Sequence, residues 1–537
     1  MKYRMSLVLL ALLPGAVGAV EPPRVNASTQ PHVFRYTEAE DIQGLNPVLN
    51  TQGPVNRIGQ LAMAWLFRYD RENRPEPELA TVVPTEKNGG ISADGKTITY
   101  YIRKNVRWSD GQPFDADDVV FSFGVMNNPA NNVSSREGFE LITKIDEPNK
   151  TTVIVHLKKP FSPFIPTFFA TGGGNPCLLP KHILGALANI NEAPYNSLPV
   201  GVGPFRFTAW KRSDAVELEA NPYYWRGLPK LKKIVYKIIP DRNTSLSQLQ
   251  TGELDYWYPI PGAYLARAQT IRTIDLLRQP GYLYNHLDFN LTKPALQEKV
   301  VRQALRLAID RKVLRDKVAH GVGFLQESVV PEPYPGVKKL ASVPFDIAKA
   351  NALLDAAGWK RAADGVRAKN GVRLSLEFAS SSGSPDVDTQ LEIIRGEWQQ
   401  IGVEMTVKRY PSSMLFAPEQ SGGIVYGGKF DVISIAWGVG ALDDLYDGFA
   451  CAAAPPNGQN DMHYCNKELD SILVDFQTRY DAARQASDLD KAAATIAEDV
   501  PTIVTSSRED IFGFNKDLKN FHPNNVTYFD DMMQVDI

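Results

Sequence analysis

Three carboxylates follow an apolar run near the end of the chain and could bind a cation. The run extends from Phe430 to Trp437, and Asp443, Asp444 and Asp447 come shortly after it. Carboxylates in a loop can hold a divalent cation, but they are equally typical of a solvated acidic loop. A carboxylate beside an aromatic residue can also pair with the desolvated ammonium group of a ligand. The residue types leave these three interpretations open.

Two cysteines and a histidine follow these carboxylates. Cys451, His463 and Cys465 would give a zinc ion only three ligands, because no fourth ligand stands at the usual spacing. In an exported chain the two cysteines could instead close a loop of about fourteen residues, which would stabilise the fold by roughly 3 kcal/mol. We therefore expect a Cys451–Cys465 disulfide and a buried free thiol at Cys177.

Motifs for catalysis or nucleotide binding are weak or absent. The chain contains no Gly-x-Ser-x-Gly elbow and no His-Glu-x-x-His pair. The segment from Gly423 to Lys429 has the spacing of a phosphate-binding loop. However, Phe430 stands where Ser or Thr must hold Mg²⁺, and a strand follows where a helix is needed. Seven histidines are spread through the chain, so no nucleophile can be paired with a base. These absences are only mild evidence against an enzyme, because a catalytic triad need not be close in sequence. We expect no enzyme activity, no cofactor and no bound metal.

The N-terminus has the pattern of a secretory signal. Lys2 and Arg4 precede the apolar run from Leu7 to Leu13, and small residues then follow as far as Ala19. The run is too short to cross a membrane as a helix. We expect a signal peptide over residues 1–19, cleaved near Ala19, and a periplasmic mature protein.

Length and charge narrow the class of protein further. A chain of 537 residues exceeds what one core supports, so two or three domains are expected. The net charge is −3 and the charged residues are mixed in sign, which argues against binding to nucleic acid. A hydrophobic content of 43% indicates a globular chain with substantial cores.

The elements that must position the candidate residues alternate between strands and helices. Phe430–Trp437 is typical of a buried strand. Val372–Phe378 and Val403–Arg409 are expected to be strands on either side of a helix over Asp388–Ile401. Val300–Val318 is expected to form one amphipathic helix. This alternation predicts an α/β fold.

One block of thirty residues carries a distinctive order of signals. Asp94-Gly95 predicts a turn, and Thr97–Ile102 predicts a half-buried strand. A second turn at Asp110-Gly111 is followed by Asp115, which can cap a helix whose first turn is acidic. We interpret this block as part of the scaffold, because it brings no polar groups together around a pocket.

Further motifs follow in the same order as in a known family. The chain resembles the family 5 extracellular solute-binding proteins of ABC importers, which include peptide, nickel and opine receptors. The resemblance covers nearly the whole mature chain, and several motifs in order make it far more specific than any one of them. They are Leu45-Asn-Pro47, Leu79-Ala80, Gly201-Val-Gly-Pro-Phe205, Asn221-Pro-Tyr-Tyr-Trp225, Ile239-Pro-Asp241, Thr251-Gly-Glu-Leu-Asp255, Val301-Arg-Gln-Ala-Leu305, Ala308-Ile-Asp-Arg311, Ala356-Ala-Gly-Trp359 and Asn457-Gly-x-Asn460.

The resemblance implies a periplasmic binding protein type II-like clamp of two lobes, with an extra small α+β domain in the first lobe. Lobe I would comprise residues 32–62, 200–282 and 506–537, and the extra domain residues 63–199. Lobe II would comprise residues 283–505. A solute would bind between the lobes, and hinge closure would bury it.

The resemblance also implies where a ligand would bind. In peptide-binding relatives a carboxylate shortly after a tryptophan pairs with the α-amine of the peptide. In this chain Trp437 is present, and Asp443 and Asp444 follow later than in the dipeptide-binding relatives. Asp41 stands where some oligopeptide-binding relatives have an acidic ligand contact. Backbone groups of Gly438 and Gly440 could pair with an extended peptide.

We therefore expect a monomeric receptor that hands a solute, with a peptide as the first candidate, to the permease of an ABC importer. A nickel chelate, an opine or an oligosaccharide is the alternative solute. A secreted peptide hydrolase and an exported folding or interaction factor are the alternatives from other classes of protein.

Overall fold

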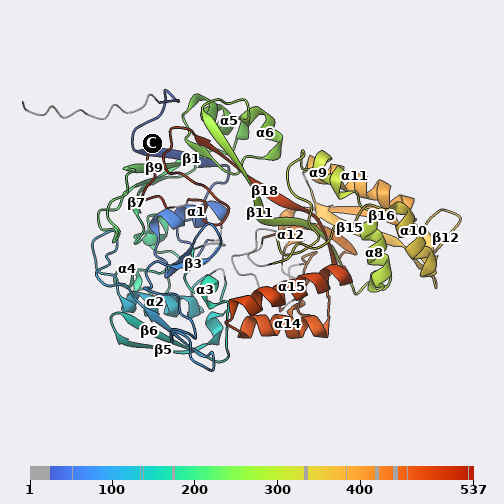
Figure 1. The fold of residues 1–537 in the computed structure, drawn as a ribbon, viewed down its shortest axis with the longest axis horizontal. Helices are drawn as coiled ribbons and strands as arrows, with labels where there is room; N and C mark the ends of the chain where they lie inside the picture. The colour runs from blue at the N-terminus through green and yellow to red at the C-terminus, as the bar shows by residue number, and fades with distance from the viewer. Residues whose placement is uncertain are drawn as a thin grey trace, which may run out of the picture.

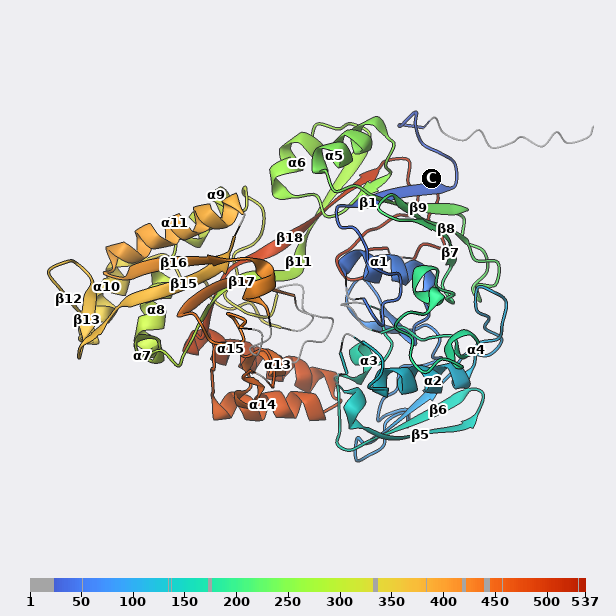
Figure 2. The same cartoon turned by 180° about the vertical axis from the view of Figure 1, so that it is seen from behind.

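Two long antiparallel strands run through the molecule and are shared by its two lobes. The computed structural model describes residues 24–537 apart from residues 51, 134, 137, 172–175, 332–336, 383, 418–421, 439–444, 456 and 530. Strand β11 (Ile274–Phe289) pairs with strand β18 (Thr502–Asn515) in a ten-stranded sheet. The strand order is β16-β15-β17-β11-β18-β10-β1-β9-β8-β7. The lobes lie toward opposite ends of this pair, so the α/β two-lobed clamp is confirmed (Figure 1; Figure 2).

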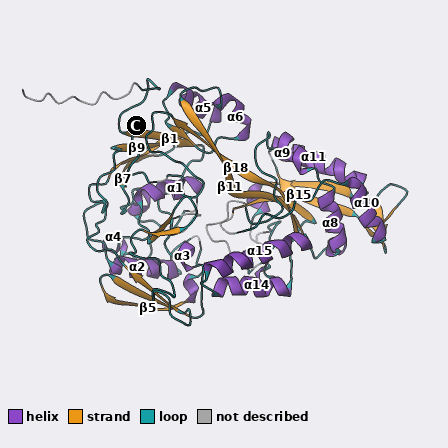
Figure 3. Cartoon of the chain, viewed as in Figure 1, coloured by secondary structure: helices purple, strands orange, loops and turns teal. Residues whose placement is uncertain are grey.

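Lobe I contains the N-terminal strand, and helices cover both faces of its half of the sheet. Its strands are β1 (Val33–Glu38), β7 (Phe205–Lys211), β8 (Ala215–Ala220), β9 (Lys233–Ile238) and β10 (Tyr256–Trp257). Helix α1 (Gly53–Ala62) packs in one apolar cluster on one side of the sheet. Helices α5 (Arg242–Thr251) and α6 (Gly262–Ala268) pack with a second cluster on the other side (Figure 3).

A smaller α+β unit is inserted after α1 and shares the apolar cluster of that helix. Its main sheet has the order β4-β6-β5, and helix α2 begins at a capping box formed by Asp115 and Asp118. The expected strand and cap of the Asp94 to Phe123 block are therefore confirmed. The elements are β2 (Phe67–Tyr69), β3 (Pro75–Pro77), β4 (Thr97–Tyr101), α2 (Ala116–Asn127), β5 (Ile142–Asn149), β6 (Thr152–Leu157), α3 (Phe164–Thr167) and α4 (Lys181–Leu184).

Lobe II carries three parallel strands and most of the long helices. Strand β15 lies between β16 and β17, and β17 pairs with β11. Two apolar clusters cover the two sides of this half of the sheet. The elements are α7 (Pro294–Gln297), α8 (Lys299–Leu307), α9 (Arg311–Lys317), α10 (Ile347–Ala356), β12 (Lys360–Arg361), β13 (Arg367–Lys369), β14 (Val372–Arg373), β15 (Ser375–Ser381), α11 (Pro385–Gln400), β16 (Glu404–Tyr410), α12 (Ser412–Leu415), β17 (Val432–Gly438), α13 (Tyr446–Phe449), α14 (Lys467–Thr478) and α15 (Ala482–Asp499).

The single helix expected over Val300–Val318 is wrong. The structure has α8 and α9 in its place, because the Asp310 side chain accepts hydrogen bonds from the backbone N–H groups of Lys312 and Val313 and starts a second helix. The strand expected over Val372–Phe378 is likewise divided into β14 and β15. In the first case the hydrogen bonds of the Asp310 side chain interrupt the helix. In the second the backbone N–H of Leu374, between the two strands, donates to the Arg367 carbonyl.

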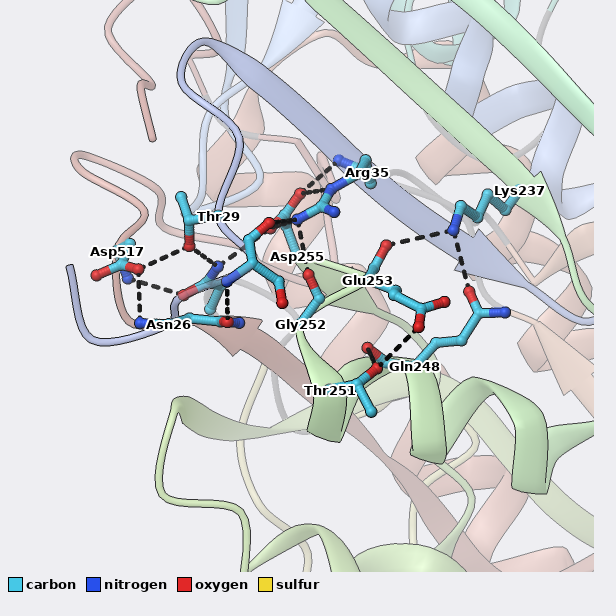
Figure 4. A network of polar contacts seen from close by, with 12 residues as sticks. Asn26, Thr29, Arg35, Lys237, Gln248, Thr251, Gly252, Glu253, Asp255 and Asp517 are labelled. Atoms are coloured by element: carbon cyan, nitrogen blue, oxygen red, sulfur yellow. Dashed lines mark hydrogen bonds and ion pairs between the residues drawn. The ribbon is translucent and has the colours of Figure 1, made fainter.

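A buried ion pair joins three distant segments of lobe I (Figure 4). Arg35 on β1 donates from Nε to Asp255 Oδ2 and from Nη2 to Asp255 Oδ1, both at 2.8 Å. Asp255 is 0% exposed and also accepts from Asn515 Nδ2, at the end of β18. Removing one partner of such a pair leaves a buried charge and typically costs about 3–5 kcal/mol. Asp255 in the Thr251-Gly-Glu-Leu-Asp255 motif is therefore structural.

Two sequence motifs of lobe II, Val301–Leu305 and Ala308–Arg311, each contain a buried arginine with a structural role. Arg302 is 4% exposed and donates to the backbone carbonyls of Leu296, Gln297, Asp499 and Val500. Arg311 forms an ion pair with Glu327, and both side chains are 6% exposed. These motif arginines stabilise the lobe, because their guanidinium groups are occupied inside it.

The expected disulfide is present, and it closes the segment that follows Trp437. Cys451 and Cys465 are bonded at a sequence separation of 14. The two sulfur atoms are therefore not available as thiolate ligands for zinc. Cys177 is a buried free thiol, as expected.

Candidate functional site

The carboxyl ends of parallel strands in an α/β sheet are where ligands usually bind. In lobe I the parallel strands β9, β1 and β10 end at Ile238, Glu38 and Trp257. In lobe II the parallel strand β17 ends at Gly438, which lies opposite Leu283 of β11. The strand ends of both lobes therefore approach the middle of the β11–β18 pair. We look for the solute site there.

The pairing of β11 with β18 is irregular at this point. The register shifts between Pro280 and Tyr284 and again between Asn285 and His286. We call residues 280–285 of β11 and 506–510 of β18 the hinge ribbon. Such irregularities bend and twist a strand pair, so the hinge ribbon is where the two lobes can change their relative angle.

Two of the expected ligand residues lie directly beside the hinge ribbon. Trp437 is opposite Tyr284, and Gly438 is exposed at the end of β17. Trp437 is half-buried and packs against the apolar cluster that contains Tyr284 and Leu445. The tryptophan is thus both a cluster residue and a residue at the edge of the site.

Three other expected ligand residues, Gly440, Asp443 and Asp444, lie outside the described residues. The described chain resumes at Leu445, in the same apolar cluster as Trp437. Their role in binding stays a prediction.

Asp41 lies in lobe I, and its carboxylate is engaged within that lobe. Its Oδ2 accepts a hydrogen bond of 2.6 Å from the Ser213 hydroxyl, and its Oδ1 accepts from the Ile42 N–H. Ser213 belongs to the turn between β7 and β8, on the side of β1 away from the hinge ribbon. The structure therefore does not bring Asp41 next to Trp437.

A different set of side chains fills the lobe I side of the hinge ribbon. We call Glu38, Arg57, Tyr258, Asp510 and Tyr528 the lobe I polar cluster. Arg57 Nε donates to Glu38 Oε1 at 2.7 Å, and its guanidinium lies 5.5 Å and 5.1 Å from the ring centroids of Tyr258 and Tyr528. The Tyr258 hydroxyl donates to Asp510 Oδ1 at 3.0 Å. Tyr528 has a φ of 56°, which is rare for an aromatic residue and often marks functional sites.

Burial governs the electrostatics of this cluster. It raises the pKa of Asp510 to about 6, against the Tyr258 hydroxyl and the nearby Arg57 and Arg508 guanidinium groups, which lower that pKa. Burial also raises the pKa of the Glu38 carboxyl, although Arg57 opposes this effect. Carboxylates with perturbed pKa values beside strand ends are typical of functional sites.

None of the lobe I polar cluster was predicted from the sequence, because its members come from β1, α1, the residue after β10, β18 and the C-terminal segment. One signal was available. Arg508, Glu509 and Asp510 are three successive charges inside a strand whose other residues are mostly buried. Charges in the interior of such a strand need a special environment.

The two lobes also meet on the side of the cleft opposite the hinge ribbon. The turn between α14 and α15 touches the extra domain, and the views of Figures 1 and 2 agree on this position. We call these hydrogen bonds the rim contact. They are Ser162 N to Gln477 O (2.7 Å), Ser162 Oγ to Phe476 O (2.6 Å), Gln485 Nε2 to Ser162 Oγ (2.9 Å), Phe161 N to the Tyr480 hydroxyl (3.0 Å) and the Tyr480 hydroxyl to Gly95 O (2.7 Å).

The two lobes therefore meet at two places, the hinge ribbon and the rim contact. A separate groove of about 780 Å³ runs along β11 in lobe I, between Gln279, Pro280, Asn525 and the Arg71–Glu72 turn. Its lining residues belong to the lobe I side and exclude Trp437. It reaches the hinge ribbon at Pro280.

Metal and membrane sites find no support in the described ranges. Within them, no three His, Cys, Asp or Glu side chains are grouped to hold a metal ion. Within the same ranges, no helix has both the length and the apolar character needed to cross a bilayer.

A cleft between two lobes, joined by a strand pair and lined by strand ends, defines a solute-binding clamp. The chain belongs to family 5 of the bacterial extracellular solute-binding proteins. The family model described as "Bacterial extracellular solute-binding proteins, family 5 Middle" matches residues 74–454. Members of this family are solute receptors of ABC importers and are not enzymes. The chain is therefore a receptor that acts in the periplasmic or extracellular space.

Similar proteins include receptors for different solutes. The oligopeptide-binding protein AppA of Bacillus subtilis is 27% identical over 463 residues, covering 85% of this chain and 82% of AppA. The glutathione-binding protein GsiB of Pectobacterium atrosepticum is 28% identical and covers 87% of each chain. The structure of NikZ from Campylobacter jejuni with Ni(L-His) has a TM-score of 0.74 at 26% identity, and it covers 94% of this chain and 99% of NikZ.

The raised pKa of Asp510 predicts a pH-dependent stability difference. The folded pKa is about 6, above the usual value of roughly 3.9. The fold therefore favours the protonated carboxyl, and this contribution is complete below pH ~4 and lost as the pH rises through about 6. We expect Asp510→Asn to be more stable than the natural protein by about 2–3 kcal/mol at pH 8, with no gain at pH 4. Urea unfolding at both pH values measures this difference.

Asp94→Asn is the control and should show no such gain at pH 8, because the Ser92 hydroxyl lowers the Asp94 pKa. A pH-independent gain for Asp510→Asn would contradict this account.

The rim contact predicts an effect on closure. Tyr480→Phe keeps the ring beside Phe164 and removes the hydroxyl that joins Phe161 and Gly95. Two lost hydrogen bonds correspond to about 1–2 kcal/mol against the closed form. We expect a larger radius of gyration in small-angle X-ray scattering and a roughly 5- to 30-fold weaker solute affinity.

The control for this variant is Tyr223→Phe, since Tyr223 is 44% exposed. Unchanged scattering and affinity for Tyr480→Phe would show that the rim contact does not bias closure.

Proposed function

We propose that this receptor binds peptides and delivers them to the permease of an ABC importer. The observation that carries the proposal is that the two lobes meet at two places, the hinge ribbon and the rim contact. Such an arrangement encloses a solute of limited length between the lobes. The similarity to the oligopeptide-binding AppA and to the glutathione-binding GsiB supports a peptide, since glutathione is itself a tripeptide.

The chemistry of the cleft supports the same solute class. The end of β17 offers the exposed backbone of Gly438 beside the half-buried ring of Trp437. An extended peptide can pair with a free strand end through its backbone and place its side chains in flanking pockets. The lobe I polar cluster supplies the charged and hydroxyl groups on the opposite side.

A nickel chelate is the second candidate, favoured by the similarity to NikZ. The chain gives it less support than a peptide. His286 lies close to Trp437 in the sheet, but it is 4% exposed and its Nδ1 contacts Asp288 Oδ1 at 2.7 Å. A buried imidazole held in this way cannot reach a solute in the cleft.

We further propose the organisation that goes with this function. The boundaries at residues 282/283 and 505/506 coincide with the register shifts of the hinge ribbon, which supports their role as the limits of the two lobes. Residues 1–19 are proposed to be a signal peptide cleaved near Ala19. The mature receptor is proposed to act as a monomer.

The solute class can be tested on the freshly purified protein. Native mass spectrometry followed by identification of the released solute should find a peptide or a mixture of peptides. Thermal melts with di- to pentapeptides should show an increase in melting temperature, because binding to the folded state alone stabilises it. A bound sugar or nickel complex, with no melting shift from any peptide, would contradict the peptide assignment. Cleavage of the added peptides would instead indicate a hydrolase.

The role of Asp443 can be tested with matched peptides. If its carboxylate pairs with the peptide α-amine, Asp443→Asn should weaken the binding of free-amine peptides by tenfold or more, about 1.4 kcal/mol, and that of N-acetylated peptides far less. Isothermal titration calorimetry measures both affinities. Asp388→Asn on α11 is the control, because the Asp388 side chain is 52% exposed. Equal weakening of both kinds of peptide would remove Asp443 from this role.

A further inference from the structure

One edge of strand β11 is covered in lobe II and free in lobe I. Strand β18 pairs along the other edge of β11 in both lobes. Strand β17 covers the first edge only from Leu283 to Phe289. In the ranges that the structure describes, no strand or isolated bridge pairs with this edge over residues 274–282. In an antiparallel pair every second residue directs its backbone N–H and C=O groups away from the partner strand, so these groups face the free edge.

A groove follows this free edge. The groove of about 780 Å³ is lined on the β11 side by Asp275, Leu276, Leu277, Gln279 and Pro280. Successive side chains point to opposite faces of a strand, so a groove confined to one face would be lined by alternate residues only. Consecutive residues line this one, and it therefore includes the backbone edge of the strand.

The size and the walls of the groove fit a ligand. Its volume lies within the range of ligand sites, roughly 300–1,000 Å³, whereas three other cavities of the described ranges have about 80, 140 and 160 Å³. Phe514 and Phe521 supply aromatic surface, with ring centroids 5.6 Å apart. The Asn525 side chain donates to the Pro280 carbonyl and so holds the C-terminal segment beside β11.

The charges around the groove are of both signs. Arg71 and Glu72 line it from the extra domain, and Asp275 lines it from β11 with its Oδ1 at 3.9 Å from Lys516 Nζ. This mixture selects neither an anionic nor a cationic ligand. The free backbone groups and the aromatic rings instead suit an extended peptide segment, which can pair with the edge and place alternate side chains against the walls.

The groove ends where the proposed peptide site begins. Pro280 lines the groove and belongs to the hinge ribbon. Three residues further along β11, Leu283 lies opposite Gly438 at the end of β17, and its side chain is 38% exposed. Three residues of a strand span about 10 Å. A peptide held at the end of β17 can therefore continue along the same edge of β11 into the groove.

We propose that the groove binds the part of a long peptide that extends beyond the cleft, by strand addition to the free edge of β11. This inference rests on the peptide function proposed above. Backbone hydrogen bonds give affinity without regard to sequence. Residues 274–280 span about 20 Å at 3.3 Å per residue, which accommodates about six residues of an extended peptide. The receptor thus accepts peptides longer than those enclosed between its lobes.

Hydrogen–deuterium exchange tests this proposal on the natural protein. The protein is saturated with a random pool of tripeptides or with a random pool of octapeptides, and exchange is followed in fragments that cover residues 274–280. Tripeptides span about 10 Å and stay in the cleft, whereas octapeptides reach the groove. The octapeptide pool should slow exchange in these fragments by roughly tenfold relative to the tripeptide pool, because the outward N–H groups become hydrogen-bonded.

A variant of the groove gives the second readout. Leu277→Lys places a charge against the aromatic part of the groove, and Leu228→Lys is the control, because Leu228 is 66% exposed and lies outside the groove. The natural protein and the control should bind the octapeptide pool roughly tenfold more tightly than the tripeptide pool, and Leu277→Lys should reduce this ratio to about twofold or less. Unchanged tripeptide binding shows that the variant is folded.

Equal exchange of residues 274–280 with both pools, when both raise the melting temperature, would overturn the proposal and leave the peptide function intact. An unchanged ratio of affinities in Leu277→Lys would do the same, as would an increase in melting temperature with tripeptides alone. If neither pool raises the melting temperature, the peptide function and the role of the groove both fail.

Discussion

The pairing of β11 with β18 is the constraint on which the rest of the structure depends. Both lobes build their sheets on this one pair, β17 on one edge and β10 on the other. The lobes can therefore move only as the pair bends or twists. Its two register shifts lie between Pro280 and His286, where the paired backbone is interrupted and the strands can change angle. Asp510 stands on the same short stretch and accepts a hydrogen bond from Tyr258 of the lobe I polar cluster.

Lobe I is assembled from separate parts of the chain, and this also follows from the strand pair. After β11 leaves lobe I, the chain forms all of lobe II before β18 returns. Asp255 binds Arg35 from β1 and Asn515 from the end of β18, and it thereby joins the first, middle and last parts of the lobe. In lobe II, Arg302 joins two segments in the same way, because its guanidinium donates hydrogen bonds to backbone carbonyls of both. The buried arginines hold each lobe rigid, which leaves the hinge ribbon as the place for movement.

Much of the fold could be predicted from the sequence, because local residue patterns indicate the helices and strands and the ordered motifs indicate the family. The cap at Asp115 and the disulfide between Cys451 and Cys465 are local or compartment-dependent features, and both are confirmed. The helix predicted over Val300–Val318 was wrong, because a single capping carboxylate at Asp310 outweighs the amphipathic pattern. For the site, the sequence predicted Trp437 as a ligand residue; the structure places it opposite Tyr284 of the hinge ribbon, and its role in binding stays a prediction. The other predicted residue, Asp41, accepts a hydrogen bond from Ser213. The lobe I polar cluster could not be predicted, because five distant elements contribute one residue each.

The location of the solute is the central claim, and a crystal structure of the protein loaded with a bound peptide tests it most directly. The account predicts electron density for the peptide between the end of β17 and the hinge ribbon. The lobes should be in contact through Ser162 and Tyr480. Density in the groove along β11 between Gln279 and Asn525, with the cleft between the lobes empty, would contradict it.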